Sequence, residues 1–101
     1  MQYKIKILKA FEKSAFEADS HLYAVSSKAA DNFYNNYNSR IELIRDNPFI
    51  FQMFEGIAYF RSAPLIYGYR LFYHIDEKNK TVILHRILHG AMDLERQLSI
   101  D

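Results

Sequence analysis

The spacing of apolar residues changes halfway along this chain of 101 residues. From Phe11 to Ile44, apolar side chains recur every three or four residues, which is the period of a helix with one buried side. Beyond Pro48, aromatic and β-branched residues gather in short runs that are typical of strands. Helices followed by a run of strands predict an α+β fold.

Two helices are predicted in the first half. The first apolar stripe consists of Phe11, Ala15, Ala18, Leu22 and Val25. The second consists of Ala30, Phe33, Tyr34, Tyr37, Ile41 and Ile44. Ser26 or Ser27 can cap the start of the second helix, and Asn47-Pro48 should end it.

Four strands are predicted around these helices. They cover residues 3–8, 58–63, 67–75 and 81–89. The polar residues 76–80 have the length of a hairpin loop, Gly90 marks a turn, and residues 93–99 add a short final helix. The predicted order is β-α-α-β-β-β, with the helical hairpin packed on one face of a mostly antiparallel sheet, in a single domain over residues 1–101.

Composition narrows the possible functions. The chain has no Cys, and its four His residues lack metal-ligand spacing, so we expect neither a metal site nor a cofactor. Its apolar runs are far shorter than the roughly 20 residues that cross a bilayer, and no leader peptide is visible. We therefore expect a cytoplasmic protein that does not associate with membranes. A formal net charge of +1 disfavours a partner held mainly through phosphates.

The hairpin between the last two strands suggests a charged surface. If Ile75 pairs with Thr81, then Arg70 lies directly opposite Arg86. One face then carries Tyr69, Leu71, Tyr73, Ile75, Ile83, His85 and Ile87 and is the better face for helix packing. The other carries Arg70, Phe72, His74, Val82, Leu84, Arg86 and Leu88.

Directly opposed like charges destabilise a sheet, so the Arg70–Arg86 pair should have a compensating anion. One candidate is an internal carboxylate, such as that of Glu55, Asp93 or Glu95. The alternative is a phosphate or an acidic segment of a partner, because a guanidinium group binds both. Both interpretations stay open.

Several motifs resemble those of the RelE/ParE superfamily of small bacterial toxins. Gly68-Tyr69-Arg70-Leu71-Phe72-Tyr73 is similar to the GYR-containing strand of that family, and Ile87-Leu88-His89-Gly90 is similar to its last strand. Asp93-Leu94-Glu95-Arg96 follows at the expected place. Ala29-Ala30-Asp31, with Phe33, resembles the head of the second helix in the ParE branch.

The resemblance implies the toxin of a type II toxin–antitoxin system, which inhibits growth, stabilises plasmids and is neutralised by a cognate antitoxin. The ParE branch implies inhibition of DNA gyrase without nuclease activity. The first alternative is a RelE-type endonuclease that cuts messenger RNA on the ribosome, and the second is a non-toxic binding module of the same fold. Self-association as a homodimer also stays open.

The residues favour the non-catalytic branch. Ala91 and Met92 stand where family members often carry Arg. If the chain is a nuclease, the candidate catalytic residues are Arg70 and His89, since cleavage needs cations and a proton carrier. The predicted binding surface consists of Arg61, Arg70, Phe72, His74 and Arg86.

Overall fold

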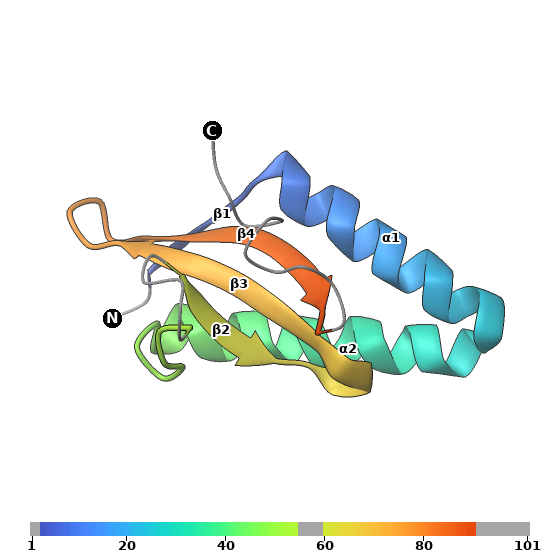
Figure 1. The fold of residues 1–101 in the computed structure, drawn as a ribbon. Coiled ribbons are helices and arrows are strands. Elements are labelled where there is room, and N and C mark those ends of the chain that lie inside the picture. Colours follow the sequence, from blue (N-terminus) through green and yellow to red (C-terminus); the bar gives the residue numbers. More distant parts are fainter. Residues whose placement is uncertain (1–2, 55–59, 91–101) are drawn as a thin grey trace.

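A computed structural model describes residues 3–54 and 60–90 and confirms the predicted α+β class (Figure 1). The elements are β1 (Lys4–Ile7), α1 (Lys9–Val25), α2 (Ser27–Asp46), β2 (Arg61–Pro64), the 3-10 turn η1 (Ile66–Gly68), β3 (Tyr69–Asp76) and β4 (Thr81–His89). The predicted final helix and residues 58–59 lie outside the described part of the chain.

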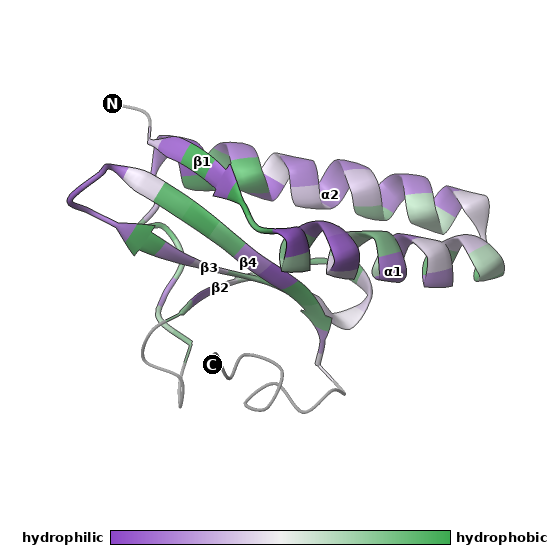
Figure 2. Cartoon of the chain, turned by 90° about the horizontal axis from the view of Figure 1, so that it is seen from above, coloured by the Kyte–Doolittle hydropathy of each residue, from purple (hydrophilic) through white to green (hydrophobic). Residues whose placement is uncertain are grey.

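The two helices form the predicted hairpin. Ser26 joins them: its N–H donates to Leu22 O at 2.8 Å and ends α1, while its Oγ accepts from the Ala29 N–H at 3.2 Å and caps α2. The predicted stop at Asn47-Pro48 is confirmed, because α2 ends at Asp46. Figure 2 shows both helices side by side on one side of the sheet. No helix in the described ranges is long and apolar enough to span a membrane.

The sheet has the strand order β1-β4-β3-β2. β1 runs parallel to β4, and the other neighbouring pairs are antiparallel. β4 therefore lies inside the sheet, between the first strand of the chain and β3. Tyr67 and Gly68, predicted to begin a strand, instead adopt the positive φ angles 62° and 81° in the turn before β3.

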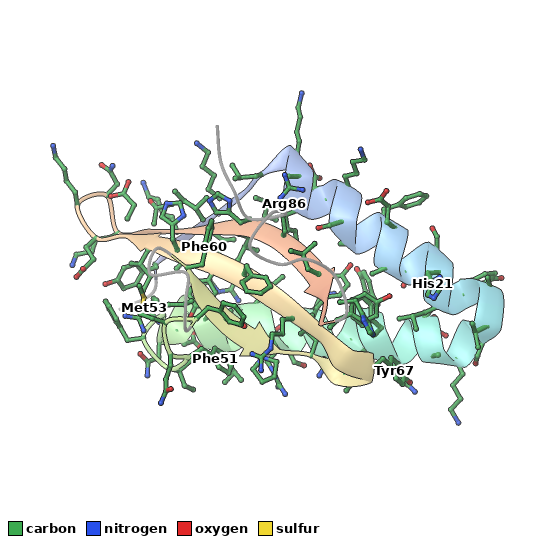
Figure 3. The ribbon with its side chains drawn as sticks, viewed as in Figure 1. His21, Phe51, Met53, Phe60, Tyr67 and Arg86 are labelled. Carbon is green, nitrogen blue, oxygen red and sulfur yellow. The ribbon has the colours of Figure 1, made fainter. Side chains whose placement is uncertain are left out.

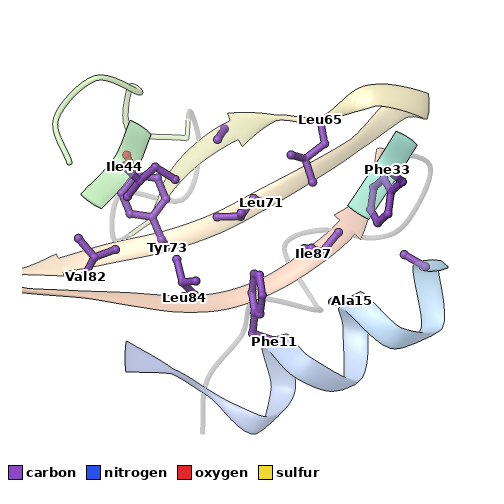
Figure 4. Packing of buried hydrophobic residues seen from close by; sticks show 12 residues of the cluster. Phe11, Ala15, Phe33, Ile44, Leu65, Leu71, Tyr73, Val82, Leu84 and Ile87 are labelled. Carbon is purple, nitrogen blue, oxygen red and sulfur yellow. The ribbon is translucent and has the colours of Figure 1, made fainter. Parts of the chain in front are cut away.

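The main core lies between the helices and the sheet (Figure 4). Phe33, Ile44, Leu71, Tyr73 and Leu84 are fully buried there. The predicted helical stripes were wrong at two other positions. Val25 is 78% exposed because it is the last residue of α1, and Tyr34 is 55% exposed because it points away from the face that buries Phe33.

α1 also completes the edge of β4 beyond the end of β1. The Leu8 N–H donates to Leu84 O at 3.2 Å, and this is where the pairing between β1 and β4 stops. Further along, the Ile87 N–H donates to Ser14 Oγ at 2.9 Å, and the same hydroxyl donates to Phe11 O at 2.9 Å. The buried Ser14 hydroxyl thus accepts the hydrogen bond that a carbonyl group of a neighbouring strand would otherwise accept.

The predicted register of the last hairpin was wrong. Asp76, not Ile75, pairs with Thr81, and a bulge next to Phe72 shifts the ladder once more. As a result Arg86 lies opposite Phe72, and Arg70 lies opposite Leu88. The two arginines are not a directly opposed pair, so the argument that they need a shared anion fails.

The corrected register also changes the two faces. Val82 and Leu84 belong to the helix-covered face, together with Tyr69, Leu71, Tyr73, Ile75 and Ile87. The opposite side of the sheet, here called the distal face, carries Arg70, Phe72, His74, Ile83, His85, Arg86 and Leu88. The predicted faces are correct for Arg70, Phe72, Arg86 and Leu88, because the two one-residue shifts add up to two residues beyond the bulge and so restore the predicted alternation.

Candidate functional site

The distal face has an apolar centre. Phe60, Phe72 and Leu88 are almost completely buried, and Phe54 packs against them. The Phe54 and Phe72 rings meet edge to face, with 5.2 Å between centroids. Phe72 was predicted as part of a binding surface, but its side chain is covered by neighbouring residues of this chain.

Arg70 is the polar group at the margin of this apolar centre. Its Nη1 donates to Ser62 Oγ at 2.9 Å, and its guanidinium carbon lies 5.8 Å from the centroid of the Phe54 ring. A cavity of about 430 Å³ opens beside it, lined by residues 50–54 together with Ser62, Pro64 and Arg70. An oriented guanidinium group in such a cavity can bind a carboxylate or a phosphate.

Arg61 lies on the other side of the sheet. It pairs with Tyr73 of the helix-covered face, and its Nη1 donates to Phe51 O at 2.8 Å. Its guanidinium carbon also lies 5.0 Å from the centroid of the Phe49 ring. Tyr73 donates its hydroxyl to Pro48 O at 2.6 Å, and burial raises its pKa to about 12. These contacts hold the chain after α2 against the sheet, so Arg61 does not share a surface with Arg70.

Two histidines stack farther along the distal face. The rings of His74 and His85 lie 4.9 Å apart, and Phe60 meets His85 edge to face at 4.7 Å. Burial, together with the charges of His74 and Arg86, lowers the pKa of His85 to about 4. Burial also lowers the pKa of His74. His85 is therefore neutral near pH 7 and a poor proton donor there.

His89 and Arg86 line a different cavity, next to α1. This space of about 180 Å³ also includes Glu17 and Tyr69 in its lining, and Arg86 lies beside α1 in Figure 3. His89 pairs with Tyr69, whose ring meets the imidazole edge to face at 4.9 Å. Gly68 has a positive φ angle of 81°, and a Cβ atom there would lie 3.0 Å from His89 Nε2, so the backbone conformation and the close contact both favour glycine.

The two candidate catalytic residues therefore do not converge. Arg70 projects from the distal face, whereas His89 shares the helix-covered face with Tyr69. Within the described part of the chain, no His, Asp or Glu lines the cavity that contains Arg70, and no group of three such residues could hold a metal ion. This cavity can bind an anion, but its described lining contains no proton carrier for general acid–base catalysis.

Sequence reasoning missed the partners of Arg70. Ser62 and Phe54 orient its guanidinium group, yet neither belongs to a recognisable motif. One signal was available: Ser62 sits in a predicted strand otherwise rich in apolar and aromatic residues, and a buried hydroxyl there needs a hydrogen-bond partner.

Comparison with known families agrees with this arrangement. The sequence model of the ParE toxin of the type II toxin–antitoxin system parDE matches residues 5–94. The chain belongs to the ParE toxin family. It is thus a toxin of a type II toxin–antitoxin system, in the RelE/ParE superfamily. No protein of curated function matches this ParE-family chain at a significant level.

Solved structures show the same fold for this ParE-family toxin. A mutant of Escherichia coli RelE in the free state superposes with a TM-score of 0.67 at 13% identity, over 96% of this chain and 93% of that one. The structure from the intact E. coli RelBE complex superposes with a TM-score of 0.64 at 14% identity, over 89% of this chain and 99% of that one. The structure from the Mycobacterium tuberculosis RelBE2 complex superposes with a TM-score of 0.59 at 19% identity, over 88% of this chain and 99% of that one.

Proposed function

We propose that this ParE-family toxin inhibits DNA gyrase by binding it, without cleaving RNA, and that a cognate antitoxin neutralises it. The observation that carries the proposal is the separation of Arg70 and His89 on opposite faces of the sheet. RNA cleavage needs a proton carrier next to the cations that stabilise the phosphorane. The cavity beside Arg70 lacks one among its described residues.

Arg70 then serves as a binding residue. Its guanidinium group is held by Ser62 and Phe54 at the mouth of an open cavity, where a carboxylate of a protein partner can approach it. Arginine is one of the residue types enriched among those that contribute most to the binding energy of protein interfaces. In this proposal the toxin acts in the cytoplasm and stabilises the replicon that encodes it.

The antitoxin partner has separate support. Two of the solved structures with the same fold are RelBE complexes, in which a toxin is bound to its antitoxin. A toxin that can arrest its own host needs such a partner. We therefore infer that this chain also forms a complex with an antitoxin of its own.

A supercoiling assay tests the proposed target. The purified toxin should inhibit supercoiling by gyrase at micromolar concentration. Arg70→Ala should weaken inhibition about 10-fold, because the cavity loses its cation. Lys28→Ala, at an exposed position at the start of α2, should leave inhibition unchanged.

A translation reaction tests the nuclease alternative. Messenger RNA should stay intact when the toxin is added. Cuts at fixed positions, abolished by Arg70→Ala and by His89→Ala, would reject the proposal in favour of the RelE-type activity.

A further inference from the structure

Tyr67 holds a backbone conformation that tyrosine rarely adopts. Its φ and ψ angles are 62° and 24°, in the left-handed region, inside the turn that joins β2 to β3. Apart from glycine, mainly Asn and Asp adopt this region, and a bulky side chain there costs free energy. Gly68, the next residue, also has a positive φ angle, but glycine adopts it without strain. The strain in this turn is therefore concentrated at Tyr67.

The surrounding structure keeps Tyr67 in this conformation. On one side of it, the Ile66 N–H donates to Oδ1 of Asn36 in α2 at 2.9 Å. On the other side, the Gly90 N–H, directly after β4, donates to Gly68 O at 2.9 Å. A strained residue persists only where its neighbours fix the chain. The contacts of the two flanking residues, and not those of the tyrosine, thus determine the shape of the turn.

The side chain of Tyr67 does not offset the strain through contacts of its own. It is 46% exposed. Among residues 3–54 and 60–90, its hydroxyl makes no hydrogen bond and its ring meets no other aromatic ring. A glycine or an asparagine would form the same turn with less strain. Stability therefore does not explain the tyrosine, and strained residues of this kind are concentrated at functional sites.

The turn adjoins the cavity beside Arg70. Pro64, which precedes the turn, pairs with Arg70 and lines that cavity. Pro64 is exposed, and its carbonyl oxygen accepts a hydrogen bond from Nε of Arg40 in α2 at 3.1 Å. Figure 3 shows Tyr67 at the turn between β2 and β3. The strained tyrosine thus stands beside the region where the proposed target binds.

We propose that Tyr67 is a contact residue for the protein target, and that its ring packs against an apolar part of the target surface next to the segment bound by Arg70. Tyrosine suits this role, because its ring buries a large area with little loss of conformational entropy and its hydroxyl can stay in water. The fixed turn presents the ring before binding, which lowers the entropy lost on association. The inference rests on the proposed inhibition of gyrase and adds a contact residue outside the cavity.

Gyrase inhibition and urea denaturation of the full-length toxin, measured on the same variant, test the inference. Tyr67→Asn should weaken inhibition about 10-fold, because the target loses contact with the ring. The same variant should unfold at an equal or higher urea concentration, because asparagine tolerates a positive φ angle. A residue needed only for stability would give the opposite result, with a lower urea midpoint and unchanged inhibition by the folded protein, and that result would overturn the inference.

Two further variants show whether the effect belongs to this ring. Tyr67→Phe keeps the ring and should inhibit gyrase as strongly as the unmodified toxin. Tyr23→Asn is the matched control: Tyr23 is 65% exposed near the end of α1, in an ordinary helical conformation, and its loss should leave inhibition unchanged. Equal weakening by Tyr67→Asn and Tyr23→Asn would contradict a specific contact.

Calorimetric titration of the toxin with gyrase separates the inference from the proposed function. If the unmodified toxin does not bind gyrase, the proposed function and the inference both fail. If it binds, and Tyr67→Asn binds equally tightly, only the inference fails. If the unmodified toxin instead cuts messenger RNA, and Tyr67→Asn cuts less, the ring stacks on a base and the inference is wrong. Weakening of the antitoxin complex alone would likewise assign the ring to another partner and reject it.

Discussion

The imidazole of His85 shows how a single residue can link packing to pH. It sits at the bulge in β4, is 9% exposed, and packs against the rings of Phe60 and His74. Because burial penalises its charged form, the folded protein keeps it neutral down to a pH of about 4. In the unfolded chain the same group accepts a proton near pH 6.5.

The protein should therefore lose stability as the pH falls from about 6.5 towards 4. In that range the unfolded state binds more protons than the folded state, so the free energy of unfolding decreases with decreasing pH. Between pH 7 and 4.5, His85 alone should remove about 2 kcal/mol. His74, whose pKa is also lowered, acts in the same direction.

Urea denaturation at the two pH values measures this effect. His85→Phe keeps an aromatic ring in place and should remove most of the difference between them. His21→Phe, on the exposed side of α1, should keep the wild-type pH dependence. A His85→Phe protein that loses as much stability as the wild type would contradict the assignment.

The alternation of side chains along the strands correctly predicted the face of Arg70, Phe72, Arg86 and Leu88. It did not predict their partners across the hairpin. Asp76 looked like a loop residue because it is polar. In the structure it is the last paired residue of β3, and its carboxylate accepts hydrogen bonds from Asn79 N and Nδ2 at 3.2 and 2.8 Å. The bulge has no signature in the sequence either. Periodicity fixes the face of a side chain, but pairing depends on turn geometry.

At the scale of elements, α1 supplies a hydrogen-bond acceptor that a neighbouring strand would otherwise offer to β4. Ser14 presents its hydroxyl to the edge of β4, where β1 has already ended. The helices, their Ser26 junction and their end at Asp46 were all predictable from local signals. The contact between Ser14 and Ile87 was not, because it joins residues far apart in the sequence, and a lone Ser on a helix has many explanations.

Ser14→Ala should destabilise the protein by about 1–3 kcal/mol, because it leaves the buried Ile87 N–H without its acceptor. Ser20→Ala, at an exposed position in the same helix, should change the free energy of unfolding by less than about 0.5 kcal/mol. Chemical denaturation of both variants measures the difference. Equal stabilities would show that the hydroxyl does not complete the sheet.

At the scale of the whole molecule, two hollows lie on opposite sides of a two-layer protein. The groove between α1 and α2 opens on the outside of the helical layer, and the cavity beside Arg70 opens on the distal face.

The layered α+β arrangement could be predicted from the sequence, because the apolar residues follow a helical period before the strand-like runs begin. A helical hairpin must bury its apolar side chains against the strands that come after it. The positions of the exposed side chains could not be predicted in this way. Phe16 lies outside the predicted stripe, and only the packing of α1 against α2 shows that it borders a groove rather than standing alone on a helix surface.

The parallel pairing of β1 with β4 has a consequence for biosynthesis. The first strand finds its partner only in the last described strand, so a nascent chain cannot close its sheet until about residue 84 has left the exit tunnel.

Stalled chains exposed to residue 76 should be degraded by added protease, whereas chains exposed to residue 90 should resist it; equal resistance would contradict this order. The ribosome must therefore translate most of the described residues before β1 can take its place in the sheet.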